Sequence, residues 1–99
     1  MNNVLRFFAL AALLGCRPAP TLYRTLTDSA RRTCDANQRF HLEARGADER
    51  AARDAGEEQI RAMARETKTC GAYIVTETAG RRLDGGFNYA ANYQMCRCE

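Results

Sequence analysis

Two cysteines one residue apart, in Cys96-Arg97-Cys98, form the most chemically distinctive motif of this 99-residue chain, which has five cysteines in all. Two thiols beside an arginine could exchange disulfides or bind a soft metal ion, because a nearby positive charge favours the thiolate. The chain has no paired CxxC spacing and its only histidine is His41, so the usual ligand pattern of a zinc site is missing. Structural bridging is therefore the favoured role of Cys96 and Cys98, and thiol-redox or soft-metal chemistry is the alternative.

Other residue types that could catalyse a reaction lack the partners that such a reaction needs. His41 stands between Arg39 and Glu43, but a catalytic histidine also needs a nucleophile and an orienting group. Acidic residues between positions 48 and 58 could supply an acid/base pair, yet a salt-bridged helix face explains them equally well. No phosphate-binding loop, nucleophile elbow or metalloprotease motif occurs. We therefore predict no enzymatic activity, no catalytic residue and no metal.

The first 16 residues have the pattern of an export signal. Residues 1–6 carry one positive charge, and residues 7–15 are an unbroken run of apolar or small residues. That run is shorter than the roughly 20 residues that a membrane-spanning helix needs, but it suits the apolar region of a signal peptide. Leu13-Leu14-Gly15-Cys16 at its end resembles the lipobox of bacterial lipoproteins.

The resemblance covers residues 1–16 and implies that Cys16 is lipidated and becomes the first residue of the mature protein. The implied cofactor is then only this covalent lipid, and the implied partner is the membrane. In lipoproteins of enteric bacteria an acidic residue after the cysteine often marks inner-membrane retention; Arg17 is not acidic, which favours the outer membrane, with the domain facing the periplasm or the exterior. The alternative is an uncleaved N-terminal helix in which Cys16 is an ordinary buried thiol.

Removing a signal peptide of residues 1–15 would leave about 84 residues, which is one small domain at most. Residues 16–20 contain Pro18 and Pro20 and are expected to form an extended tether. Residues 21–99 are expected to form the domain. So small a domain is marginally stable without covalent staples. With Cys16 lipidated, an even set of four cysteines remains, and we predict that it forms two disulfides: Cys34, Cys70, Cys96 and Cys98.

Two helices are expected in the first part of the domain. Leu22, Leu26, Ala30 and Cys34 recur at helical spacing, which predicts an amphipathic helix from Thr21 to about Arg45. The segment from Asp48 to Thr67 is rich in Ala, Glu and Arg and has opposite charges four residues apart, which predicts a second helix with a solvated outer face.

A β-hairpin is expected at the C-terminal end. Residues 73–78 are mostly β-branched or aromatic, residues 79–86 contain turn-forming glycines, and residues 87–96 alternate between an aromatic and a polar face. A turn near residue 83 places Cys70 opposite Met95 and Cys96. A bridge from Cys96 to Cys98 would be strained, so Cys70 is expected to pair with one of them and Cys34 with the other, with the choice left open. The predicted fold is a small α+β domain of two helices followed by a disulfide-stapled antiparallel hairpin.

The charge of the chain argues against nucleic acid as a partner. The formal net charge is +3, and the basic residues alternate with acidic ones instead of forming a cluster. Tyrosines, asparagines and the arginines of the predicted turn are the best candidates for contacting a protein, although a small domain also needs its aromatic residues as core. The candidate partner-binding residues are Arg81, Arg82, Asn88, Tyr89, Asn92 and Tyr93.

These observations support the hypothesis of a membrane-anchored envelope lipoprotein that acts in binding, assembly or exclusion and catalyses nothing. One alternative is a membrane-tethered redox or metal-binding protein that uses Cys96 and Cys98. Another is a secreted, disulfide-rich soluble protein, which requires that Cys16 carry no lipid.

Overall fold

A computed structural model describes residues 19–99, so the lipobox, Cys16 and most of the expected tether lie outside the described residues. Within residues 19–99, no helix is both long and apolar enough to cross a membrane.

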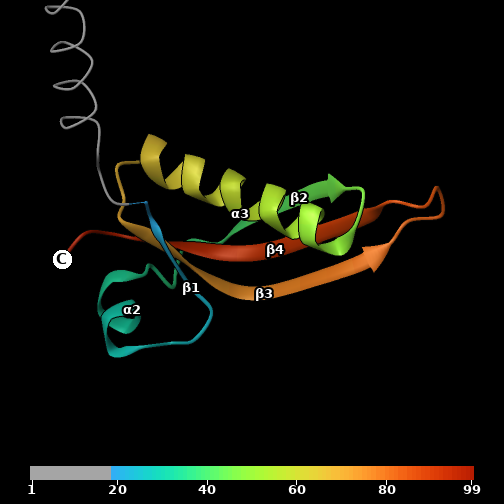
Figure 1. The fold of residues 1–99 in the computed structure, drawn as a ribbon. Coiled ribbons are helices and arrows are strands. Elements are labelled where there is room, and N and C mark those ends of the chain that lie inside the picture. Colours follow the sequence, from blue (N-terminus) through green and yellow to red (C-terminus); the bar gives the residue numbers. More distant parts are fainter. Residues whose placement is uncertain (1–18) are drawn as a thin grey trace, which may run out of the picture.

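The described chain is a small α+β domain in which a four-stranded mixed sheet carries a long helix on one face (Figure 1). The elements in chain order are β1 (Thr21–Tyr23), α2 (Asp28–Thr33), β2 (Phe40–Gly46), α3 (Glu49–Glu66), β3 (Gly71–Arg81) and β4 (Phe87–Cys96). The strand order is β1-β3-β4-β2, with β1 parallel to β3 and the other pairs antiparallel. The helix α3 thus connects β2 to β3, and β4 lies between these two strands.

The predicted helix from Thr21 to Arg45 is wrong, because this segment forms two strands with one short helix between them. Thr27 caps α2 by accepting a hydrogen bond from the Ala30 amide, and the helix ends after six residues at Cys34. From Phe40 onward the burial alternates with a period of two, which is the pattern of a strand with one covered face. Each strand finds its partner elsewhere in the chain, and that pairing overrides the local helical spacing.

The second predicted helix is confirmed, with α3 capped by Asp48, whose side chain accepts a hydrogen bond from the Ala51 amide. The helix places small residues against the sheet. At Gly56 there is no room for a Cβ, since one would collide with the ring of Tyr89 and touch Leu42. The helix therefore lies close above β4 and β2. The residues of its buried stripe are Ala52, Gly56, Ile60 and Ala64.

The predicted hairpin is also confirmed as the pair β3–β4, and Cys70 lies at its open end, where its amide donates to the Cys96 carbonyl. A β-bulge between Ile74 and Thr76 shifts the alternation of β3. As a result, Ile74 and Glu77 both lie on the helix-covered side of the sheet, while Thr76 lies on the opposite side. On β4 the aromatic face is the buried one, with Tyr89, Ala91, Tyr93 and Met95 beneath α3.

Two disulfides lie at the end of the sheet where β1 begins. They join Cys34 to Cys96 and Cys70 to Cys98, which is one of the two connectivities that the sequence left open. Cys34 is the C-cap of α2, so the first bridge holds this helix against the face of the sheet that α3 does not cover (Figure 1). Cys96 is buried, whereas Cys70 and Cys98 are exposed.

Candidate interaction surface

The hairpin tip, residues 81–88, extends beyond the end of α3 and lies at the opposite end of the sheet from Thr21 (Figure 1). Its turn is closed by a hydrogen bond from the Arg82 amide to the Gly86 carbonyl, with the amide of Gly85 donating back to Arg82. Gly85 has a φ of 95°, a conformation that side chains disfavour and glycine tolerates. Gly85 thus allows the tight turn that presents Leu83 at its end.

The side chains of the hairpin tip are held by one another. The guanidinium of Arg82 donates to Asp84 at 3.0 Å and to the Asn88 side-chain oxygen at 2.9 Å. The hydrogen bond from Arg82 lowers the pKa of Asp84 below its ordinary value. Arg81 lies over the Phe87 ring, with its guanidinium carbon 5.6 Å from the ring centre. Two arginines are thereby held in place directly before a fully exposed leucine, Leu83.

The sheet face opposite α3 carries a polar row across three strands. The side-chain oxygen of Asn92 lies 3.0 Å from His41 Nδ1, and its amide nitrogen donates to the Thr76 hydroxyl at 2.9 Å. His41 Nε2 lies 3.7 Å from a carboxylate oxygen of Glu43. Asn92 is thus engaged within the sheet, and the row is polar across β2, β4 and β3.

Two of the six candidate partner-binding residues, Tyr89 and Tyr93, lie in the core. Tyr89 is fully buried, and its hydroxyl donates to Glu77 at 2.6 Å. Burial and the neighbouring carboxylate raise the pKa of Tyr89 to about 12. The ring of Tyr93 stacks on Phe40 with 5.5 Å between ring centres, and burial raises its pKa as well. Both tyrosines therefore build the domain, and the candidates left at the surface are Arg81, Arg82, Asn88 and Asn92.

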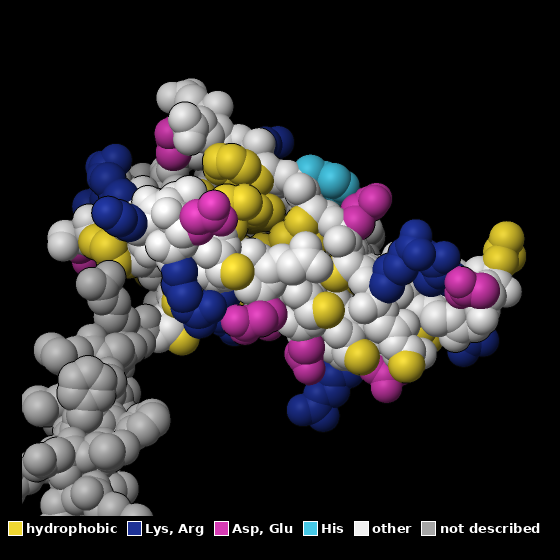
Figure 2. Space-filling model, turned by 90° about the horizontal axis from the view of Figure 1, so that it is seen from above, with side chains coloured by type: hydrophobic (Ala, Val, Ile, Leu, Met, Phe, Trp, Pro, Cys, Tyr) yellow, Lys and Arg dark blue, Asp and Glu magenta, His cyan; other side chains and the backbone are white. Residues whose placement is uncertain are grey.

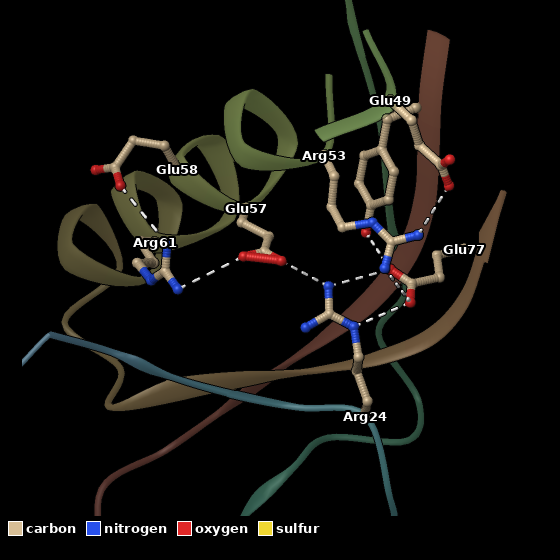
Figure 3. Close-up of polar contacts among 8 residues, drawn as sticks. Arg24, Glu49, Arg53, Glu57, Glu58, Arg61 and Glu77 are labelled. Carbon is tan, nitrogen blue, oxygen red and sulfur yellow. Dashed lines mark hydrogen bonds and ion pairs between the residues drawn. The ribbon is translucent and has the colours of Figure 1, made fainter. Parts of the chain in front are cut away.

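Arg24, in the segment after β1, connects three elements through an ionic network that the sequence did not predict (Figure 3). Its guanidinium lies 2.7 Å from Glu57 on α3 and 2.9 Å from Glu77 on β3. Its hydrogen bond to Glu77 raises the pKa of Arg24 and lowers that of Glu77. Arg53 extends the network from α3, 3.9 Å from Glu77. The network locks the segment after β1 onto the helix-bearing side of the domain.

Cys96 and Cys98 do not lie together as a pair of free thiols, since each is bonded to a different cysteine. Within residues 19–99, no group of three or more histidine, cysteine, aspartate or glutamate side chains is arranged to hold a metal ion.

Sequence reasoning missed the two most informative surface features. The predicted turn near residue 83 agrees with the structure, but Leu83 was not named among the candidate contacts, and its full exposure follows from the register of β3 and β4. The partners of Arg24 lie 33 and 53 residues away in the sequence, a separation that no local pattern reports.

No family model, no curated protein and no solved structure matches this chain.

Proposed function

We propose that this chain is a lipid-anchored envelope protein that binds another envelope protein through its hairpin tip. In this proposal Cys16 carries the lipid, the outer membrane is the favoured location, and the two disulfides staple the hairpin to the rest of the domain. Disulfides fit a compartment outside the reducing cytoplasm. The protein then acts by binding and needs no catalytic group.

The observation that carries the binding proposal is Leu83, fully exposed at the hairpin tip directly after two positioned arginines. Covering this apolar side chain with a partner surface would gain about 25 cal/mol for each Å² removed from water. Arg81 and Arg82 are already held by Phe87 and by Asp84, so little side-chain entropy is lost when they contact a partner. An acidic protein surface with an apolar hollow would complement this arrangement.

Distance from the anchor supports the same surface. Thr21, where the described strands begin, pairs with Gly71 at the disulfide end of the sheet. The hairpin tip lies at the other end (Figure 1). The tip therefore lies at the end of the domain away from the residue at which a preceding anchor would join it.

Site-specific photocrosslinking in living cells tests the proposal. A photoreactive amino acid at position 83 is expected to give a discrete crosslinked band, which the double change Arg81→Ser/Arg82→Ser should weaken at least several-fold. The matched control places the same amino acid at Asp54, an exposed position on the outer side of α3. Equal crosslinking from both positions, or none from position 83, would contradict a binding role of the tip.

A further inference from the structure

The strand β2 has an unpaired edge, and we infer that a second copy of this chain pairs with it. β2 is the last strand in the order β1-β3-β4-β2, so only one of its two edges is hydrogen-bonded to the described chain. Natural edge strands are usually protected by charged side chains, especially lysine, by proline, by bulges or by short length. The seven residues of β2 contain neither proline nor lysine and pair with β4 without a register shift, and their two charged side chains, Glu43 and Arg45, are of opposite sign.

The other open edge of the sheet is protected. β1 covers β3 only from Gly71 to Tyr73, which leaves the remainder of that edge without a strand partner. There, the bulge between Ile74 and Thr76 distorts the strand, and Arg24 binds Glu77 across the helix side. The β2 edge, by contrast, is regular over its whole length, and its opposite charges would attract a second copy of the same strand.

Charge complementarity selects a second copy as the occupant. Glu43 and Arg45 flank Ala44 and lie on the same sheet face, and the Glu43 side chain is 77% exposed. When two β2 strands run antiparallel about a two-fold axis at Ala44, each Glu43 lies opposite the Arg45 of the other copy. Directly opposite side chains of unlike charge stabilise an antiparallel pair. A shift of the axis to Glu43 or to Arg45 would instead oppose like charges.

The helix above β2 fits the same arrangement. One flank of α3 carries Arg53, Glu57 and Arg61 toward Arg24. The opposite flank is formed mainly by uncharged residues, Ala55, Gln59, Ala62 and Met63, with Glu66 at its C-terminal end, and Ala55 and Met63 pack against the core. Figure 2 shows hydrophobic side chains gathered next to the histidine, the single His41 of β2.

The spacing of the two helices in such a dimer follows from strand geometry. Neighbouring strands lie about 4.8 Å apart, and α3 packs against β2, β4 and β3, so the two helices beside a new β2 pair would be separated by two to three strand spacings, about 10–14 Å. Packed helices lie about 8–10 Å apart, so the two helices would touch at the lower end of this range. The dimer would have a continuous eight-stranded sheet with both helices on one face.

Because the two copies run in opposite directions, each end of the combined sheet would hold the start of β1 of one copy and the hairpin tip of the other. If Cys16 carries a lipid, both anchors reach one membrane only when the strands run along its surface. The inference itself stands on β2 and α3 and does not depend on the lipid or on the function of the tip.

A charge-reversal cycle tests the inference on the full chain, by sedimentation velocity over a range of concentrations in one buffer. The unmodified protein is expected to be a dimer, and Glu43→Arg or Arg45→Glu should weaken its dissociation constant at least tenfold. The double variant Glu43→Arg/Arg45→Glu should return to within about threefold of the unmodified protein. Arg82→Glu, the same charge reversal at the hairpin tip, is the control and should leave dimerisation unchanged.

A second measurement needs no variant: hydrogen exchange of the β2 amides should slow as the protein concentration rises. The inference is wrong if the unmodified protein stays monomeric at every concentration, if the single variants associate as tightly as it does, or if β2 exchange is independent of concentration. A double variant as weak as the single ones would contradict the Ala44-centred pairing.

Discussion

At the scale of single residues, Tyr89 joins the core to the ionic network. Its ring fills the space beneath Gly56, and its hydroxyl donates to Glu77, which Arg24 also binds. A buried tyrosine hydroxyl needs such a partner, because an unmet hydrogen bond in the core costs stability. The ring of Tyr89 therefore stabilises the domain by packing, and its hydroxyl stabilises it by a hydrogen bond.

Tyr89→Phe should lower the free energy of unfolding by about 1–2 kcal/mol, because it removes a hydrogen bond to a charged acceptor. Urea unfolding followed by circular dichroism measures this change. Tyr93→Phe is the matched control: Tyr93 is equally buried, and its hydroxyl makes no hydrogen bond within the described part of the chain, so a change below about 0.5 kcal/mol is expected. Equal losses from both variants would refute the role given to the Tyr89 hydroxyl.

The lowered pKa of Glu77 predicts a pH dependence of stability. Its pKa lies below the ordinary value of 4.5, mainly because of the hydrogen bond from Arg24. Folding is then favoured by the ionised carboxylate above about pH 4.5, and this contribution is lost as the pH falls through the lower pKa of the folded state. Glu77→Gln should thus be destabilising at pH 7, and its difference from the unmodified protein should shrink toward pH 3. Glu66→Gln, at an exposed position, controls for the loss of a carboxylate. If the stability difference between Glu77→Gln and the unmodified protein were the same at all pH values, the role given to the Glu77 carboxylate would be wrong.

At the scale of elements, local patterns predicted what local interactions determine. The helix α3 has its own cap and charge pairs, and the hairpin has its own turn, so both were predictable from sequence. β1 pairs with a strand about 50 residues away, and the bulge in β3 depends on packing, so local patterns in the sequence predicted neither. The helical spacing of Leu22, Leu26 and Ala30 therefore gave a wrong helix prediction, because these three residues lie in three different elements or connections.

Among the small residues of α3, Gly56 should be the one whose substitution lowers the stability of the domain most. In an exposed helix, Gly→Ala gains up to about 1 kcal/mol, but here the added methyl would overlap the Tyr89 ring, and overpacking of a core costs about 1–3 kcal/mol. We expect Gly56→Ala to lower the free energy of unfolding and to alter the near-ultraviolet tyrosine signal. Gly80→Ala is the control, since nothing lies within 4 Å of its added Cβ. Stabilisation by Gly56→Ala would show that α3 does not lie so close to β4.

At the scale of the whole molecule, one end of the sheet holds both disulfides and the start of β1, and the other end holds the hairpin tip. A domain this small gains stability from covalent links, and each bridge closes a long loop, with sequence separations of 62 and 28 residues. In the entropic model such bridges contribute on the order of 3–4 kcal/mol each. The proposed function combines this stapled end with a lipid on Cys16.

Intact mass, measured after thiol alkylation on protein extracted from bacterial membranes, tests whether Cys16 carries a lipid and whether the other four cysteines are paired. If both proposals are right, the protein lacks residues 1–15, carries acyl chains and has no alkylated thiol. Repeating the alkylation after reduction should add four labels. An unlipidated mass with free thiols before reduction would contradict the account and would return Cys96-Arg97-Cys98 to consideration as a redox or metal site.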